Sequence, residues 1–242
     1  MRRLGALLAA GAALALGACG PEQADAPDEQ RSPEPDGLLV AALGDSITAG
    51  SPGYDPDPAA RARLGFGEDE RSSYEFWAER AYPRLEYRNC GVFGERTDEI
   101  VDRLDACAEG ADVLIVQGGI NDIAQGRPLS DAAADLRAMV KRGQDLGLAV
   151  AIAEVLPWNN GHPAADRPIA ALNREIAAIA RDTDALLLRF HEALELPRGS
   201  GLIGAGLTSD GDHPSVAGYR LLGELVSERL RKHVVDPSAA YG

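Results

Sequence analysis

The sequence predicts an α/β domain in three layers, built on a mostly parallel sheet of five strands. Short, continuous apolar runs recur along the chain, and such runs are typical of strands buried on both faces of a parallel sheet. Stretches of helical periodicity separate them, and this alternation favours parallel pairing. The composition agrees, because 45% hydrophobic and 26% charged residues are the proportions of an ordinary globular domain.

The predicted elements alternate in chain order. Strands are predicted over residues 38–43, 85–90, 112–117, 148–156 and 185–190. Helices are predicted over residues 72–80, 97–109, 130–146, 168–182 and 214–233. Pro214 fits the first turn of the last helix, where a missing backbone N–H costs nothing. The long segment 51–72 is predicted as a loop, either a wall of a binding site or a solvated insertion.

The N-terminus is typical of an export signal. Arg2 and Arg3 precede an apolar stretch over residues 4–18 that is too short to span a membrane. The stretch ends in Leu16-Gly17-Ala18-Cys19, which resembles the lipobox of bacterial lipoproteins. The resemblance implies cleavage after residue 18, acylation of the Cys19 thiol and a membrane-anchored protein in the cell envelope, facing the periplasm or the outer surface. An ordinary signal with an incidental cysteine is the alternative.

The rest of the chain divides into a tether, a domain and a tail. Residues 19–37 are rich in proline and acidic residues and carry too little apolar surface to fold, so they are predicted to tether the anchor to the domain. The folded domain is predicted over residues 38–235, and residues 236–242 form a tail. The formal charge of −14 argues against a nucleic-acid partner, which needs clustered Lys and Arg. No feature of the sequence indicates an obligate protein partner.

Small and polar residues cluster after the first three predicted strands. They are Gly44-Asp45-Ser46, residues 91–94 and residues 118–122. Ligands of parallel α/β sheets bind beyond the carboxyl ends of the strands. The sequence therefore places its candidate functional site in these loops.

A serine and a histidine are the candidates for a nucleophile and its base. Ser46 directly follows the first strand, where a serine is either a nucleophile or a helix cap. His213 comes three residues after Asp210 on a loop that contains glycine, so Asp210 can accept the Nδ1 proton and leave Nε2 free as a base. Asp212 is the alternative partner, and a cap or surface role is the alternative for His213.

Two further residues can supply hydrogen bonds to a developing oxyanion. Gly94 offers a backbone N–H that a substrate oxygen can approach closely, and Asn121 offers a side-chain amide at the end of the third strand. Gly91 competes with Gly94 for this role. A turn glycine and a helix cap are the alternatives for Gly94 and Asn121.

Together these blocks resemble the SGNH hydrolase superfamily, also called the GDSL esterases and lipases. The matching blocks are Gly44-Asp45-Ser46-Ile47, residues 89–95, Gly119-x-Asn121-Asp122 and Asp210-x-x-His213. Ile47 stands where the family often has leucine, and Arg96 where it often has threonine or serine. The order and spacing agree over nearly the whole predicted domain.

The resemblance implies a flavodoxin-like sheet and a Ser-His-Asp hydrolase that uses no metal or other cofactor. Ser46 would attack an ester carbonyl, His213 would take its proton, and Asp210 would orient the imidazole. The backbone N–H groups of Ser46 and Gly94 and the Asn121 amide would form the oxyanion hole. We therefore expect a serine esterase tethered to the cell envelope, acting on a small-molecule, lipid or glycan ester.

Other functions on the same fold stay open. A carbohydrate O-deacetylase, a lysophospholipase or a thioesterase would use the same residues, and a non-catalytic envelope binding lipoprotein could keep the fold. His162, His191 and His233 match no metal-ligand spacing, so a metal site is not expected.

Five more residues are candidates for shaping or bracing the site. Tyr54 and Phe66 in the long segment, and Trp158 after the fourth strand, either face the substrate or belong to solvated or core surfaces. An exported protein can form disulfides, so Cys90 and Cys107 are predicted to pair and brace the Gly94 loop, with two buried free thiols as the alternative.

Overall fold

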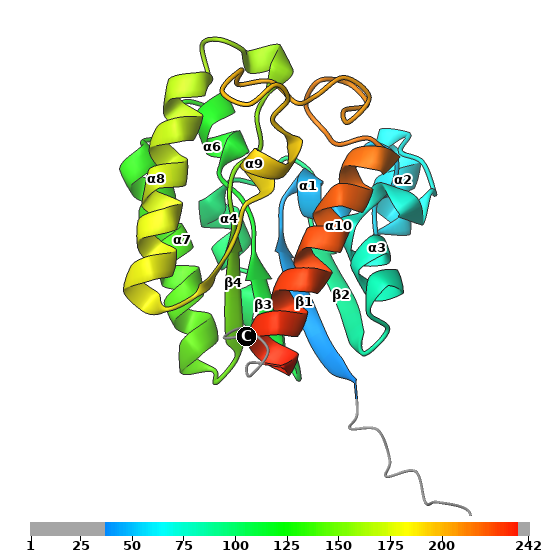
Figure 1. Cartoon of the computed structure of the whole chain (residues 1–242), viewed down its shortest axis with the longest axis vertical. Coiled ribbons are helices and arrows are strands. Elements are labelled where there is room, and N and C mark those ends of the chain that lie inside the picture. Colours follow the sequence, from blue (N-terminus) through cyan, green and yellow to red (C-terminus); the bar gives the residue numbers. More distant parts are fainter. Residues whose placement is uncertain (1–36, 237–242) are drawn as a thin grey trace, which may run out of the picture. The chain divides into compact units, whose positions relative to one another are not determined.

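A computed structural model describes residues 37–236 of the chain. The predicted signal peptide, the Cys19 lipidation site and nearly all of the predicted tether and tail lie outside these residues. Five parallel strands form one sheet in the order β2-β1-β3-β4-β5 (Figure 1). The strands are β1 Leu38–Gly44, β2 Leu85–Gly91, β3 Val113–Val116, β4 Ala149–Ala153 and β5 Leu186–Leu188. The five-stranded parallel α/β fold predicted from the sequence is confirmed.

Helices cover both faces of this sheet. The longer ones are α2 Pro58–Leu64, α3 Tyr74–Ala81, α7 Leu129–Asp145, α8 Asp166–Thr183 and α10 Val216–Leu230. The shorter ones are α1 Ser46–Ala49, α4 Thr97–Val101, α5 Leu104–Ala108, α6 Ile120–Ala124 and α9 Phe190–Leu194. Turns of 3₁₀-helix occupy Glu70–Ser72 and Asn159–Gly161, and a π-helical turn occupies Arg231–Val235. Within residues 37–236, no helix has the length and apolarity needed to cross a membrane.

Alternate residues of each central strand belong to different halves of the core. Leu114 and Val116 of β3 join the cluster formed with α4, α5, α7 and α8, whereas Val113 and Ile115 join the cluster formed with α3, α9 and α10. Figure 1 shows α10 and α3 side by side across one face of the sheet. Because strand side chains alternate between the two faces, an unbroken apolar run is what a sheet covered on both sides requires.

The last helix begins later than predicted. Ser215 is its N-cap, and the Ser215 Oγ accepts a hydrogen bond from the Gly218 N–H at 3.3 Å. Pro214 lies before this cap, in a β-bridge with Thr208. The prediction that Pro214 occupies the first turn of the helix is therefore wrong, because the serine cap after it fixes the start.

The segment predicted as one long loop contains a helix. Asp57 caps α2 by accepting the Ala59 N–H at 2.8 Å, Pro58 is its first residue, and Gly65 ends it with φ of 72°. Aspartate at an N-cap, proline at the first position and glycine after the last turn are the usual helix boundary signals. The loop prediction for residues 51–72 is therefore wrong in its central part.

Glu75 is a buried acid at the start of α3. Its side chain lies in the core, and neither carboxyl oxygen has a hydrogen-bond partner within the described part of the chain. Burial raises the pKa of Glu75 to about 8, because the apolar surroundings disfavour the charged form. The folded protein therefore holds this proton more tightly than the unfolded chain does.

We expect the Glu75→Gln variant to resist alkaline conditions better than the native protein. The contribution of the protonated acid is complete below its pKa in the unfolded chain and is lost as the pH rises towards 8. By this linkage, the native protein should lose about 3–5 kcal/mol of unfolding free energy between pH 5 and pH 9 through Glu75, and the amide should not. Urea unfolding at both pH values measures the difference. Glu79→Gln, on the exposed side of the same helix, is the matched control, and identical pH profiles for the two variants would refute the expectation.

Candidate active site

Ser46 lies in the sharp turn from β1 into α1. Asp45 is the N-cap of this helix, and its Oδ1 accepts the Ile47 N–H at 2.9 Å. A side chain at Gly44 would overlap the Thr48 Oγ1 and the Gln117 side chain, so the turn requires glycine there. The turn places the Ser46 side chain, which is almost fully buried, at the carboxyl edge of the sheet.

Ser46, His213 and Asp210 form a continuous chain of hydrogen bonds, called the candidate triad below. The His213 Nε2 lies 3.0 Å from the Ser46 Oγ, and the His213 Nδ1 lies 2.8 Å from the Asp210 Oδ2. An imidazole held by a carboxylate on one nitrogen can accept a proton from a hydroxyl on the other.

The second oxygen of Asp210 fixes the loop itself. Its Oδ1 accepts the backbone N–H groups of Asp212 at 2.9 Å and His213 at 2.8 Å. Partial burial opposes ionisation, but these bonds and the His213 ring lower the pKa of Asp210 below its usual range. Asp210 is therefore a carboxylate wherever His213 can act as a base.

Asp212 points to a different set of partners. Its Oδ1 accepts the Trp158 indole N–H at 2.6 Å and the Asn160 side-chain amide at 2.5 Å. The same amide donates to the Asp210 carbonyl at 2.9 Å, and the Asn159 N–H donates to the Gly211 carbonyl at 2.9 Å. The segment after β4 is thus hydrogen-bonded to the loop that carries His213. Trp158 takes part through its indole N–H. The geometry favours Asp210 over Asp212 as the partner of His213.

The loops after β2 and β3 bring the predicted oxyanion donors to the edge that carries Ser46. Gly94 has φ of 83°, and its N–H has no hydrogen-bond partner within residues 37–236. The Gly91 N–H, in contrast, donates to the Asn89 Oδ1 at 2.9 Å, and a side chain at Gly91 would overlap the Ala49 backbone. Gly91 is therefore a packing glycine, and Gly94 has the free donor.

The Asn121 amide is held by the neighbouring loop. Its Nδ2 donates to the Glu95 carbonyl at 2.8 Å, which uses one of the two amide protons and leaves the other. Ser46 is the first residue of α1, so its own N–H has no partner within the helix. Ser46, Gly94 and Asn121 thus each have one donor available for a substrate oxygen.

We expect Asn121→Ala to lower kcat for ester hydrolysis by about 10²–10³-fold, because one donor to the developing negative charge is removed. KM should change much less. Initial rates on p-nitrophenyl acetate measure both constants. Gln125→Ala, just beyond the same short helix, is the matched control, and an equal effect of the two substitutions would argue against an oxyanion role for Asn121.

The Gly94 loop is braced by a disulfide and by an arginine. Cys90 and Cys107 are bonded, with their Cα atoms 6.1 Å apart, so the predicted bridge is confirmed. The predicted helix 97–109 is broken between α4 and α5, and Arg103 at the break binds Glu95 with its Nη2 2.6 Å from the Oε2. Arg103 also donates to the Cys90 carbonyl at 2.8 Å and to the Gly44 carbonyl at 3.2 Å. This residue ties together the strand ends that carry Ser46 and Gly94, and the sequence did not predict it.

The acidic residues next to the site are bound to other groups of the protein. Asp122 accepts the Thr97 N–H at 3.0 Å and pairs with Arg127 at 2.8 Å. Burial raises the pKa of Asp45 to about 6. Across residues 37–236, no three His, Cys, Asp or Glu side chains lie close enough together to hold a metal ion.

The predicted substrate-facing residues of the long segment lie in different surroundings. Phe66 packs edge-on against Phe93 with ring centroids 5.1 Å apart, and Phe93 in turn lies 6.3 Å from the His213 ring. Tyr54 lies beneath the Arg61 guanidinium, 5.5 Å away. Phe66 thus comes near the candidate triad, and Phe93 is a neighbour that the sequence did not indicate.

Comparison with known families agrees with this geometry. Residues 42–221 match the model of the GDSL-like lipase/acylhydrolase family. The chain belongs to this family. Its members are carboxylic ester hydrolases, and the match spans the loops of Ser46, Gly94, Asn121 and His213. Among curated proteins, no sequence matches the chain.

Several solved structures are also similar to this chain in fold. A G-D-S-L family protein from Desulfitobacterium hafniense is 24% identical, with a TM-score of 0.67 over 80% of this chain and 99% of that one. The acetylxylan esterase Axe2 from Geobacillus stearothermophilus is 21% identical, with a TM-score of 0.64 over 81% of this chain and 94% of its own. A lipolytic G-D-S-L family member from Veillonella parvula is 19% identical, with a TM-score of 0.63 over 78% and 96%. At these identities the likeness shows the fold.

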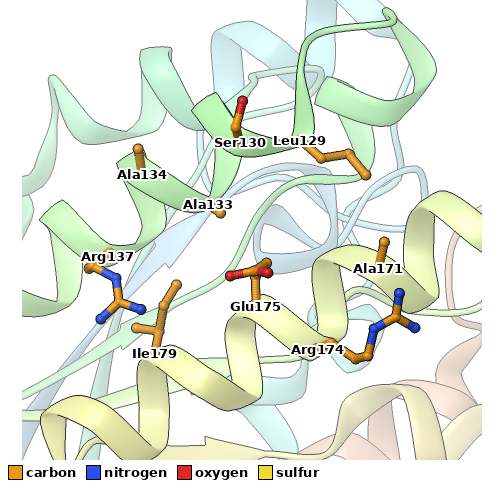
Figure 2. A pocket seen from close by; sticks show the side chains of 9 residues that line it. All are labelled: Leu129, Ser130, Ala133, Ala134, Arg137, Ala171, Arg174, Glu175 and Ile179. Atoms are coloured by element: carbon orange, nitrogen blue, oxygen red, sulfur yellow. The ribbon is translucent and has the colours of Figure 1, made fainter.

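A groove of about 550 Å³ lies elsewhere on this GDSL domain, between α7 and α8. Figure 2 shows Arg137 of α7 and Arg174, Glu175 and Ile179 of α8 around it. No residue of the candidate triad lines this groove. The groove is therefore separate from the candidate triad.

Proposed function

We propose that the protein is a serine esterase whose nucleophile is Ser46, activated by His213 and Asp210. The observation that carries the proposal is the unbroken chain of hydrogen bonds from Asp210 through His213 to Ser46. Each contact has the length of a good hydrogen bond, and each residue has the chemistry its place requires.

The reaction would proceed in two halves. The Ser46 Oγ attacks the acyl carbon and passes its proton to the His213 Nε2, while the Ser46 and Gly94 N–H groups and the Asn121 amide hold the oxyanion. The carbon–oxygen bond to the alcohol breaks as His213 returns the proton to that oxygen. Water then attacks the acyl enzyme by the same route and releases the acid. Asp210 stabilises the imidazolium in both halves.

The substrate would be a small acyl ester. The similarity in fold to an acetylxylan esterase supports short acyl groups, including acetyl groups on sugars, among the candidates. The lipobox-like sequence at Cys19 supports tethering of the enzyme to the cell envelope, where it would meet lipid or glycan esters. Esters of lipid and glycan alcohols are therefore the substrates, and the cell envelope the location, that we propose to test first.

The direct test is covalent labelling of the nucleophile. The purified protein should react with a fluorophosphonate probe, and peptide mass spectrometry should locate the adduct on Ser46. It should also release p-nitrophenol from p-nitrophenyl esters, fastest with short acyl chains. An unlabelled Ser46 together with no turnover of any ester would instead indicate a binding protein on this fold.

A further inference from the structure

An aromatic pair with one exposed ring lies next to His213. Phe93 immediately precedes Gly94 and is 43% exposed, although a phenyl ring normally gains from burial. Phe66, from the distant segment before the 3₁₀ turn Glu70–Ser72, packs against it edge-on at 5.1 Å. The Phe93 ring is tilted by 30° to the His213 ring, with the centroids 6.3 Å apart. The Phe93 ring therefore lies beside the candidate triad, packed against Phe66 and partly exposed to solvent.

The proposed reaction indicates which portion of the ester lies beside Phe93. In the proposed reaction, His213 gives its proton to the leaving alcohol oxygen, so that oxygen must lie against the His213 Nε2 when the bond breaks. The carbonyl oxygen is held by the donors at Ser46, Gly94 and Asn121. The group that extends past His213 is therefore the alcohol, and the ring beside His213 lies on the alcohol side.

We propose that Phe93, supported by Phe66, forms the binding surface for the alcohol portion of the substrate, and that the preferred alcohols present an apolar face of about ring size. The proposal rests on the proposed esterase function. Its physical basis is that covering the open Phe93 ring removes apolar surface from water in both partners. A small polar alcohol such as methanol covers almost none of that ring, and an alkyl or aryl ring covers most of it.

Phe66 has a supporting role in this surface. An edge-on neighbour restricts the tilt of the Phe93 ring, so that less ordering is left to occur on binding. The acyl group, in contrast, has no reason to touch this pair, because it leaves the reacting carbon in another direction.

Two ester series separate the alcohol side from the acyl side. The first keeps acetate and varies the alcohol through methyl, butyl and cyclohexyl acetate. The second keeps methanol and varies the acid through methyl acetate, butyrate and hexanoate. We expect Phe93→Ala to lower the ratio of kcat/KM for cyclohexyl acetate to that for methyl acetate by about 10-fold or more, mainly through KM. The ratio of kcat/KM for methyl hexanoate to that for methyl acetate should change far less. Phe66→Ala should lower the cyclohexyl-to-methyl ratio by a smaller factor than Phe93→Ala does. Phe93→Leu should restore part of the preference for cyclohexyl acetate.

Phe76→Ala is the matched control, because Phe76 makes the same kind of edge-on pair with Trp77, at 5.2 Å, within α3. A native enzyme that shows no preference among the alcohols, or a Phe93→Ala variant whose losses are equal in both series, would overturn the alcohol surface while leaving the esterase intact. Failure of the esterase itself has a different signature, since Ser46 would then not be labelled and no ester in either series would react.

Discussion

Ser46→Ala is expected to lower kcat for p-nitrophenyl acetate by about 10⁴–10⁶-fold, because no other group can form the acyl enzyme. The Ser46 Oγ is the only atom of the candidate triad that would bond to the substrate. The donors at Gly94 and Asn121 stay in place, so the residual rate should still exceed that of the reaction in water. KM should change little, since the hydroxyl adds almost nothing to ground-state binding.

Stopped-time assays at high enzyme concentration can measure this residual rate. Ser130→Ala, at an exposed position near the start of α7, controls for the loss of a hydroxyl elsewhere, and thermal unfolding checks that both variants fold. A Ser46→Ala enzyme that keeps a tenth or more of the native kcat would show that a different nucleophile or a direct attack by water operates.

Asp210→Asn should lower kcat by about 10⁴-fold, whereas Asp212→Asn should have only a small effect. An amide at position 210 can donate to the His213 Nδ1, which moves the ring proton to Nε2 and leaves no base facing Ser46. An amide at position 212 still offers an oxygen to the Trp158 indole N–H, so the hydrogen bonds between the segment after β4 and the His213 loop are largely preserved.

The comparison of these two isosteric variants discriminates between the two acids near His213. Both should be assayed from pH 5 to pH 9. Because the pKa of Asp210 lies below its usual range, Asp210 itself should not titrate in this interval, so the difference between the two variants should persist across it. If Asp212→Asn were the severely impaired variant, the assignment of Asp210 would be wrong.

The sequence predicted the sheet well because its strands carry their own signal. Each central strand is buried on both faces, so its apolar run is unbroken, and β1 and β3 lie within a residue of the predicted bounds. The helices next to loops were predicted less well. The proline and glycine content of residues 51–72 favours a loop, although Asp57, Pro58 and Gly65 are boundary signals of a helix.

The site was predictable where a residue acts through its own chemistry. Ser46 and Asn121 each follow a strand, so parallel topology places both at one edge of the sheet, and Asp210 and His213 share a short motif. Arg103 and Phe93 were not predictable, because their roles depend on side-chain contacts between segments far apart in the chain. An arginine in a helical stretch or a phenylalanine before a glycine has no distinctive pattern until the fold brings its partners close.

The hydrogen bond between Ser46 and His213 joins residues 167 positions apart, near opposite ends of the folded domain. The nucleophile is thus made early in synthesis and its base 167 residues later, so the two can meet only after most of the domain has been made. Such long-range contacts are the slow and costly ones in folding. Recovery of ester hydrolysis after refolding would therefore report completion of the fold, and an unfinished chain would carry its nucleophile without the means to use it.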